Sequence, residues 1–318
     1  MLEILTINYQ LMKTHLYISA LLLGMTACSG ESNLDVKGMV SSSSGDADSR
    51  FEQSMEYDRM HGVDTISVPD NAYKVYIMTD SHVDFSTSNL DQFVDDYLSD
   101  AEAAPFCLHL GDVINGQNHY DMCMEHLAPI WDGTGDTCFF AVGNHDLYFG
   151  QWQTYRSYIK TSVYHFVVKT PSFKDLYICL DSGNGTLGVK QRKWLEQLLE
   201  AAQEQKYRHI IVFTHTHFFK VDASQGHTSN FALEETYDLC DLFSRYGVEL
   251  VLQGHDHCRN QNYFKGVQFL IVDALEDHFY NAYYAVMEVH QSFDFQFVPV
   301  GPQDPDKFNV RVPGVPHL

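Results

Sequence analysis

The stretch Gly143-Asn144-His145-Asp146 directly follows a short apolar run, Cys138 to Val142. The run is aromatic and β-branched, and a glycine closes it, which is typical of a buried strand. Gly143 allows the backbone to turn at once into a loop. Polar side chains therefore lie at the carboxyl end of the strand, which is where open α/β sheets bind ligands.

Four other apolar runs end in the same way. The residues that follow them are Asp80-Ser81-His82, Gly111-Asp112, His215-Thr216-His217 and Gly254-His255-Asp256-His257. Asp, His and Asn supply the oxygen and nitrogen ligands that suit Mn, Fe and Zn. Five such endings predict a dense polar cluster at one edge of a sheet, and a metal centre is the simplest physical reason for it.

These five blocks resemble, in the same order, the motifs of the calcineurin-like metallophosphoesterase superfamily. Its pattern is D-x-H, GD, GNH(D/E), H and GHxH, and the resemblance covers about residues 70 to 300. It implies an α/β/β/α sandwich of two mixed β-sheets flanked by helices. The chain looks similar to both the purple acid phosphatase and the cyclic-nucleotide phosphodiesterase branches, and the motifs do not choose between them.

The resemblance also implies two divalent or trivalent metal ions, which would be Mn, Fe or Zn. It implies that one ion is bound by Asp80, His82 and His257, that the other is bound by Asn144, His215 and His255, and that Asp112 bridges them. In such a centre a metal-bridging hydroxide attacks the phosphorus of a phosphomonoester or a small phosphodiester. His145 matches the family histidine that assists the leaving group.

The chain departs from the family pattern at two positions. The family often has H-x-P where this chain has His215-Thr216-His217, so His217 is kept as a fallback ligand. Purple acid phosphatases carry a tyrosine three residues after the GD aspartate. This chain has Asn115 there, so no iron-tyrosinate colour is expected.

A different class of function remains open, namely a catalytically silent metal-binding lipoprotein that acts as a binding module. A degenerate member would be expected to lose Asp112, Asn144 or His145, and all three are present. Among the other histidines, His109 lies inside an expected strand, and a core or a surface role is expected there rather than metal binding. His119, His227 and His278 lie on expected loops that could reach the substrate.

Composition limits the partners. The chain of 318 residues carries a formal charge of −22, which argues against long nucleic acids because their phosphates would be repelled. Small phosphate esters remain compatible, because metal ions supply local positive charge. The seven cysteines show no zinc-finger spacing. The sequence predicts neither an oligomeric state nor a disulfide pairing.

The N-terminal region resembles a bacterial lipoprotein signal. Residues 12–28 have a basic start, an apolar core from Leu16 to Met25 and a lipobox-like end, Met25-Thr26-Ala27-Cys28. The core is far shorter than the ~20 residues of a membrane-spanning helix. We therefore expect a signal peptide over 1–27 with its start at Met12, lipid attachment at Cys28, export, and anchoring to a bacterial membrane through that lipid only. An ordinary secretory signal with an incidental cysteine is the alternative.

The remaining patterns set the expected domain limits. Ser, Gly and Asp dominate the region after Cys28, which predicts a flexible tether over 28–70, with one short helix near Phe51 to Met60. The folded domain is expected over 71–303 and an irregular tail over 304–318. Periodicity predicts helices over 88–98, 121–130, 190–202 and 233–246, and strands over 164–169, 176–180, 267–272, 282–289 and 293–298. Ser88 and Asp91 resemble a capping box.

Overall fold

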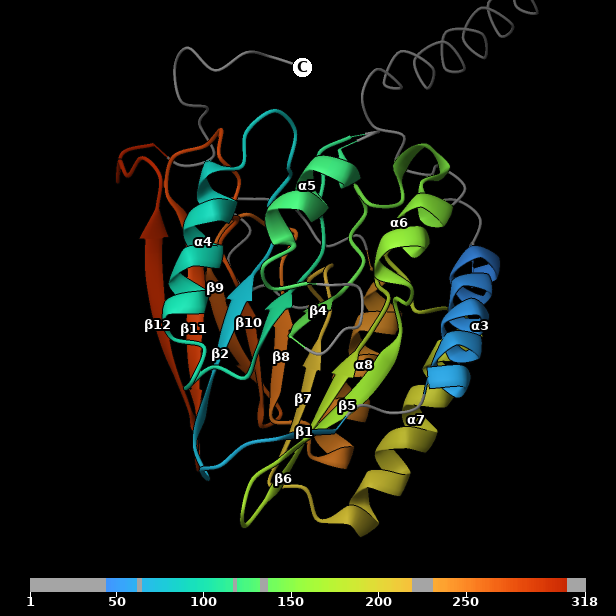
Figure 1. Cartoon of the computed structure of the whole chain (residues 1–318). Helices are drawn as coiled ribbons and strands as arrows, with labels where there is room; N and C mark the ends of the chain where they lie inside the picture. The colour runs from blue at the N-terminus through green and yellow to red at the C-terminus, as the bar shows by residue number, and fades with distance from the viewer. Residues whose placement is uncertain (1–43, 62–64, 117–118, 132–136, 219–230, 308–318) are drawn as a thin grey trace, which may run out of the picture.

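The computed structural model describes residues 44–61, 65–116, 119–131, 137–218 and 231–307. These ranges form two β-sheets packed face to face, with helices on both outer faces (Figure 1). The expected α/β/β/α sandwich of two mixed sheets is confirmed.

One sheet has five strands in the order β12-β11-β2-β3-β4. Their bounds are Phe293–Val300, Ala282–Val289, Tyr73–Met78, Phe106–His109 and Cys138–Phe140. β2, β3 and β4 are parallel, whereas β11 and β12 are antiparallel to their neighbours. The three parallel strands therefore bring their carboxyl ends to one edge of the sheet.

The other sheet has seven strands in the order β1-β5-β6-β7-β8-β10-β9. Their bounds are Thr65–Ser67, Tyr164–Lys169, Lys174–Cys179, His209–Phe213, Leu250–Gln253, Val267–Ile271 and Asn260–Phe264. β6, β7, β8 and β10 are parallel to one another. Their carboxyl ends supply the second wall of the polar cluster.

Three apolar clusters hold the layers together. The middle cluster lies between the sheets and contains Ile77 and Leu108 of one sheet and Ile211 and Leu252 of the other. β3, β7 and β8 are buried along their whole length because both faces of each sheet are covered. This explains why their sequences are continuous apolar runs rather than alternating ones.

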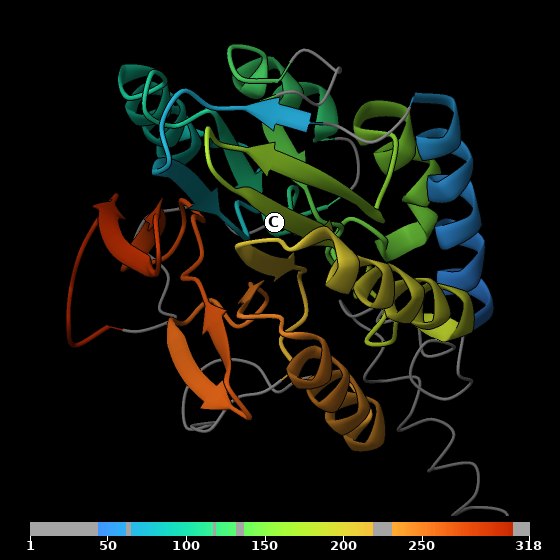
Figure 2. The same ribbon diagram turned by 90° about the horizontal axis from the view of Figure 1, so that it is seen from below.

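Helices cover the two outer faces. α4 (Ser88–Ser99), α5 (Tyr120–Leu127) and α6 (Trp152–Ile159) pack on the five-stranded sheet, where Phe93 and Tyr155 are among the buried residues. α7 (Gly188–Gln205) and α8 (Leu233–Tyr246) pack on the seven-stranded sheet. Figure 2 shows the two groups of helices on opposite sides of the paired sheets. A 3₁₀ turn, η1 (Tyr148–Gly150), precedes α6.

Several expected elements agree with the structure at both ends. β5, α8 and β11 have the expected bounds. α8 ends at Gly247, which has a φ of 73° and forms a left-handed cap. The strand β9 and the helix α6 were not expected. β9 has the sequence Asn-Gln-Asn-Tyr-Phe and lies at the edge of its sheet. Its first three residues are polar, so the hydrophobic pattern did not predict a strand there.

The expected tether over 28–70 is wrong where the structure describes it, except that the short helix expected near Phe51 to Met60 is present as part of a longer one. α3 (Ser44–His61) is one continuous helix of 18 residues, and β1 follows it in the seven-stranded sheet. The helix is polar, but Ala47, Arg50 and Ser54 are buried in its contact with the body of the protein. Polar contacts, rather than apolar periodicity, hold α3 in place, so composition alone misplaced the start of the domain.

The signal peptide, Met12 and Cys28 lie outside the described residues, as do 308–318 of the expected tail. Asp304 to Lys307 lack helix and strand and include a turn, as expected for that part of the tail. Within the described ranges, no helix is both long and apolar enough to cross a membrane. The six cysteines of these ranges, Cys107, Cys123, Cys138, Cys179, Cys240 and Cys258, are free and buried.

Candidate metal centre

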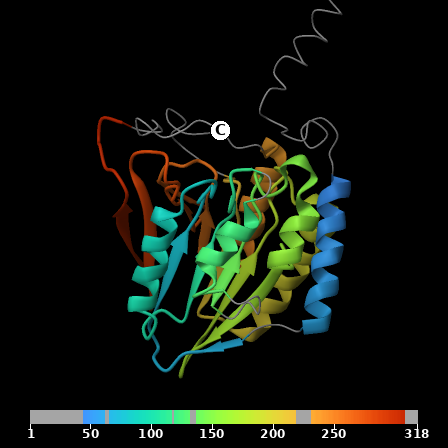
Figure 3. The same ribbon diagram turned by 45° about the horizontal axis from the view of Figure 1, so that its top comes forward.

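The polar endings of five strands meet at one edge of the paired sheets. The loops after β2, β3 and β4 come from one sheet, and those after β7 and β8 come from the other. Figure 3 brings this edge forward, with the loops that follow these strands gathered between the two groups of helices. The gathering follows from parallel pairing, because parallel strands end on the same side.

Asp80, His82 and His257 form the first ligand group. Each offers one ligand atom, and these atoms lie within 4.8 Å of one another. His257 Nε2 is 3.3 Å from Asp80 Oδ1, and the Nε2 atoms of His82 and His257 are 3.0 Å apart. The structure thus brings together the three residues expected to bind one ion.

Asp112, His215 and His255 form the second group, again with ligand atoms within 4.8 Å. Asn144 joins it, since its Oδ1 lies 3.0 Å from His215 Nε2. His215 Nδ1 is 3.0 Å from the carbonyl oxygen of Leu110, so Nδ1 carries the proton and Nε2 is left for a metal. His215, rather than the fallback His217, lies in this described group.

Asp112 stands between the two groups. Its Oδ2 is 3.6 Å from His82 Nε2 and 3.3 Å from His215 Nε2. Its Oδ1 accepts a hydrogen bond of 2.7 Å from the backbone N–H of His145, which fixes the orientation of the carboxylate. This is the position that a bridging ligand requires.

His145 lies closer to the candidate ligands than a remote leaving-group residue would. It forms a third group with His82 and Asp112 within 4.8 Å, and its ring centroid is 4.5 Å from that of His82. Its Nδ1 lies 3.1 Å from the carbonyl oxygen of Asn115. A carbonyl only accepts, so Nδ1 donates there and Nε2 remains available for substrate or metal.

The charges at the site shift several pKa values. Burial, with the nearby His145, lowers the pKa of His82 to about 4. Burial disfavours the charge on His215, but Asp112 and Asp80 outweigh it and raise the pKa of His215 to about 9. Although burial opposes it, the facing histidines hold the pKa of Asp112 well below its usual range. The carboxylate of Asp112 therefore stays negatively charged among the surrounding histidine rings.

The backbone at this edge is strained. Five of the seven candidate ligands have a positive φ, namely Asp80 (49°), His82 (42°), Asp112 (54°), His255 (71°) and His257 (58°). This region is uncommon for residues other than glycine and costs on the order of 1–3 kcal/mol each. Such strain persists only where the surroundings fix it, and its concentration on the candidate ligands indicates a functional site.

Two glycines make the close approach of the loops possible. A Cβ on Gly143 would lie 2.1 Å from Asp112 Oδ1, and one on Gly254 would lie 2.0 Å from Thr79 Oγ1. Neither position can hold a side chain without moving the candidate bridge or the loop of Asp80. The glycines of the motifs therefore serve the spacing of the ligands.

Asp146 holds together the loops that carry the candidate ligands, a role that the sequence pattern did not reveal. Its buried carboxylate accepts from the backbone N–H groups of Asp112 (3.0 Å), Val113 (3.1 Å) and Gly143 (2.9 Å), and from the hydroxyl of Tyr120 (3.0 Å). Burial and the nearby Asp112 raise the pKa of Asp146 to about 6. One side chain thus joins the loop after β3 to the loop after β4.

His109 also positions the loops. It is buried, and it belongs to none of the candidate ligand groups. Its Nδ1 accepts from the N–H of Gly111 at 3.2 Å, so its Nε2 donates to Ser81 Oγ at 2.8 Å. Ser81 donates in turn to the carbonyl oxygen of Val113 at 2.9 Å. Burial lowers the pKa of His109 to about 3, and the neutral ring links the loops after β2 and β3.

The remaining histidines contact neighbouring loops. His119 Nδ1 lies 3.2 Å from the carbonyl oxygen of Val83, and His278 Nε2 lies 2.6 Å from Asp84 Oδ1. Both side chains therefore support the segment that follows His82. His227 lies outside the described residues.

The donor set fits a pair of metal ions. Asp80 Oδ1 is buried and faces the His257 ring at 3.3 Å, and the buried His82 Nδ1 has no hydrogen-bond partner among the described residues. Two imidazole nitrogens 3.0 Å apart, facing buried carboxylates, are an arrangement that cations would stabilise. Nitrogen and oxygen donors without thiolates suit Mn, Fe or Zn.

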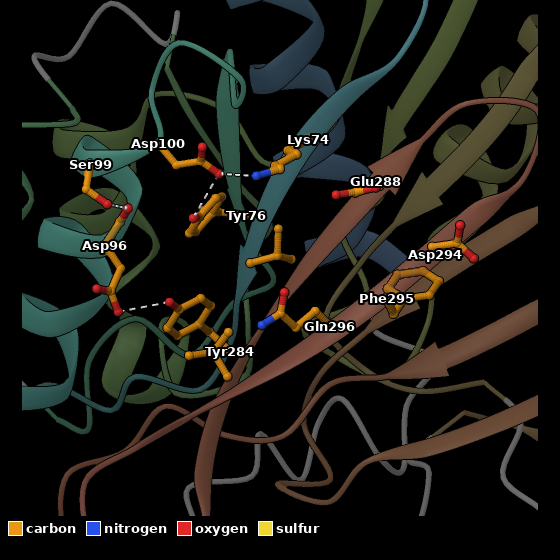
Figure 4. A pocket seen from close by; sticks show the side chains of 12 residues that line it. Lys74, Tyr76, Asp96, Ser99, Asp100, Tyr284, Glu288, Asp294, Phe295 and Gln296 are labelled. Carbon is orange, nitrogen blue, oxygen red and sulfur yellow. Dashed lines mark hydrogen bonds and ion pairs between the residues drawn. The ribbon is translucent and has the colours of Figure 1, made fainter.

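A separate cavity lies away from this cluster. It occupies about 390 Å³ between the end of α4 and the outer faces of β2, β11 and β12 (Figure 4). Asp100 accepts there from Lys74 and Tyr76, and Asp96 accepts from Tyr284. These two carboxylates are thus engaged with their neighbours, and none of the candidate ligands lines the cavity.

Comparison with known proteins gives a family match. The family model described as calcineurin-like phosphoesterase matches residues 73–259, which is more than half of the chain. A segment of 89 residues is 30% identical to the rat serine/threonine-protein phosphatase CPPED1, and it covers 27% of this chain and 28% of that protein. The match therefore spans little more than a quarter of the curated relative.

Solved structures show the same fold at low identity. A dimetal phosphatase from Danio rerio has a TM-score of 0.56 at 13% identity, covering 71% of this chain and 95% of that one. Purple acid phosphatase PPD1 from yellow lupin has a TM-score of 0.56 at 14% identity, covering 72% of this chain and 52% of that one. GAP50, the anchor in the inner membrane complex of Plasmodium, has a TM-score of 0.53 at 14% identity, covering 72% of this chain and 84% of that one.

Proposed function

The chain belongs to the calcineurin-like phosphoesterase family, and from that premise we propose that it hydrolyses small phosphate esters at a dinuclear metal centre. The position of Asp112 carries the proposal. One carboxylate oxygen lies 3.6 Å from His82 Nε2 and 3.3 Å from His215 Nε2, so one side chain can serve both ligand groups.

Each group of side chains has a definite task. One ion would be held by Asp80, His82 and His257. The other ion would be held by Asn144, His215 and His255, and Asp112 would bind both ions. When bound, the ions would activate water for attack and neutralise negative charge on the phosphate oxygens. The strained loops and the glycine contacts hold the donors ready, which reduces reorganisation when substrate binds.

His145 would assist the leaving group. Its Nδ1–H donates to Asn115, which orients the ring and leaves Nε2 as the atom that exchanges a proton. Tyr148 flanks it, with ring centroids 4.6 Å apart, and its hydroxyl accepts from Asn144 Nδ2 at 2.7 Å. The proposed substrates include both phosphomonoesters and small phosphodiesters.

Turnover of two aryl phosphates tests the proposal. The purified chain, supplied with Mn²⁺, would be assayed with mono(4-nitrophenyl) phosphate and bis(4-nitrophenyl) phosphate, and again after chelation. Metal-dependent release of nitrophenolate from either ester supports catalysis, and the ratio of the two rates gives the preference. If metal binds but neither these nor alkyl phosphates are hydrolysed, the alternative of a silent metal-binding module would replace the proposal.

We also propose that the chain is exported and held at a bacterial membrane by lipid on Cys28. The support is the sequence of residues 12–28 alone, which lies outside the described structure.

The strongly acidic charge of −22 is compatible with small phosphate esters bound at metal ions rather than with long nucleic acids as partners.

A further inference from the structure

A buried ion pair joins the N-terminal helix α3 to the body of the protein. Arg50 of α3 donates from Nε and Nη2 to the two carboxylate oxygens of Asp181, at 2.7 and 2.9 Å. Arg50 is 5% exposed and Asp181 is fully buried. A two-pronged pair of this kind fixes both the position and the orientation of a carboxylate.

Further contacts from α3 and its neighbours hold this pair. Ser162 Oγ donates to Asp181 Oδ2 at 2.9 Å and lies 3.3 Å from Ser54 Oγ of α3. The guanidinium of Arg50 also lies over the ring of Trp152, 5.9 Å from its centroid. Figure 2 and Figure 3 show α3 alongside α7, whose contact helps to keep the helix in place.

Ser182, the residue after Asp181, holds the loop of a candidate ligand. Its Oγ accepts from the N–H of Thr216 at 2.8 Å and lies 2.6 Å from Thr214 Oγ1. Its carbonyl oxygen accepts from Thr216 Oγ1 at 2.9 Å. Thr214 and Thr216 are the two neighbours of His215, so Ser182 contacts both sides of that residue.

Gly183, one residue further, packs on the central motif. A Cβ at this position would lie 3.0 Å from the carbonyl oxygen of Gly143 and 2.7 Å from Leu147 Cδ1. Its own N–H donates to Asp181 Oδ1 at 3.3 Å. The segment that Asp181 holds thus contacts the loop of Asn144 as well as the loop of His215.

We propose that Arg50 is a positioning residue for the ion held by Asn144, His215 and His255, and that it acts through Asp181 and the Ser182–Gly183 segment. The inference rests on the proposed function only in assuming that two ions bind. Arg50 lies before the matched family region of 73–259, so this chain adds a support from outside that region. Of the three residues expected to hold the other ion, Asp80 and His82 follow β2 in the opposite sheet, and only His257 follows a strand of the same sheet, β8.

Binding of Mn²⁺ to the metal-free full chain, measured by calorimetry, tests the inference without turnover. We expect Arg50→Ala to lower the affinity for one of the two Mn²⁺ ions by about 10–100-fold, the usual effect of losing a group that orients a ligand. The affinity for the other ion should be unchanged. In a His255→Ala background, which already lacks a ligand of the affected ion, Arg50→Ala should change nothing further.

Two further variants complete the test. Arg59→Ala removes an exposed arginine at the end of the same helix and should leave both equivalents unchanged. Arg50→Lys keeps the charge but not the two-pronged geometry, so it should weaken the same equivalent even if the alanine variant fails to fold.

Two outcomes would overturn the positioning role of Arg50. One is a folded Arg50→Lys variant that binds both Mn²⁺ ions with unchanged affinity, and the other is an equal loss of affinity for both ions. A wild-type chain that binds fewer than two ions would overturn the proposed function and this inference together. A chain that binds two ions without hydrolysing any ester would overturn the function alone.

Discussion

The carboxylate of Asp146 accepts a hydrogen bond of 3.0 Å from the backbone N–H of Asp112, and so ties the central motif to the candidate bridge. Three further donors use the same carboxylate, namely Val113 N–H, Gly143 N–H and Tyr120 O–H. An amide at this position would turn its NH₂ toward two of these donors. Asp146→Asn is therefore a sensitive probe of how the loops are held.

We expect Asp146→Asn to lower the free energy of unfolding by about 2–4 kcal/mol, because buried donors lose a charged acceptor. Urea unfolding of the metal-free chain measures this. Tyr120→Phe, which removes only one of the four donors, is the matched control and should cost about 1 kcal/mol. A loss for Asp146→Asn no larger than that of Tyr120→Phe would contradict the role of Asp146.

Asp112→Ala should reduce metal content as well as rate. The substitution removes a ligand from both ions and leaves two cations without the negative charge between them. Elemental analysis of the purified variant measures the result, with fewer than two equivalents expected. Retention of two full equivalents would show that Asp112 is not the bridge, whatever the rate.

The ligands of the candidate site were predictable because each follows an apolar run that the sequence shows openly. Parallel pairing then brings those runs to one edge. The assignment of Asp80, His82 and His257 to one ion came from the family resemblance, and the structure brings these three together. Asp146 belongs to the central motif, but its role depends on Tyr120 and Val113, which are distant in sequence. No local pattern contains that information.

Long-range polar contacts explain the other differences. Ser88 and Asp91 do not form the expected capping box, because α4 begins at Ser88 and Asp277 accepts from the N–H groups of Ser88 (2.8 Å) and Asn89 (2.7 Å). α3 was largely hidden by its polar composition, since its docking rests on Arg50 and Ser54. A helix held by specific partners is invisible to hydrophobic periodicity.

The pH dependence of stability should carry a contribution from His209. Burial opposes its charge, but Glu249 at 2.7 Å and the carbonyl oxygen of His290 at 2.8 Å outweigh it and raise the pKa of His209. A raised pKa stabilises the folded state below the ordinary histidine value of about 6.5, and this stability is lost as the pH rises through the raised pKa.

The free energy of unfolding of wild type should therefore exceed that of His209→Gln by more at pH 5.5 than at pH 9. Urea unfolding of the metal-free chain at both pH values measures the difference. His61→Gln, which removes an exposed histidine on α3, is the control. A difference that stays constant or grows toward pH 9 would contradict the assignment.

Cys28→Ser should release the protein from the membrane. If lipid on Cys28 is the only attachment, the substitution removes it, and the described residues offer no membrane-spanning helix in its place. Fractionation of cells should find the variant in the soluble fraction, with phosphate-ester turnover retained. A variant that stays with the membrane would count against the lipoprotein proposal.

His145→Ala should separate catalysis from metal binding. If Nε2 passes a proton to the leaving group, its loss should lower the rate by about 10²–10⁴-fold, the range for a positioned acid. The defect should shrink for nitrophenolate, because a leaving group of low pKa needs little protonation. Steady-state rates for an alkyl and a nitrophenyl phosphate, measured on one preparation, give the comparison.

The close group of His145, His82 and Asp112 makes metal content the decisive second measurement. The orientation of His145 toward Asn115 leaves one ring nitrogen for either task, so geometry alone allows a ligand or an acid. Two retained equivalents of metal together with a defect that depends on the leaving group would identify the acid. Loss of an equivalent would make His145 a ligand, and equal defects for both esters would exclude proton donation as its part in the reaction.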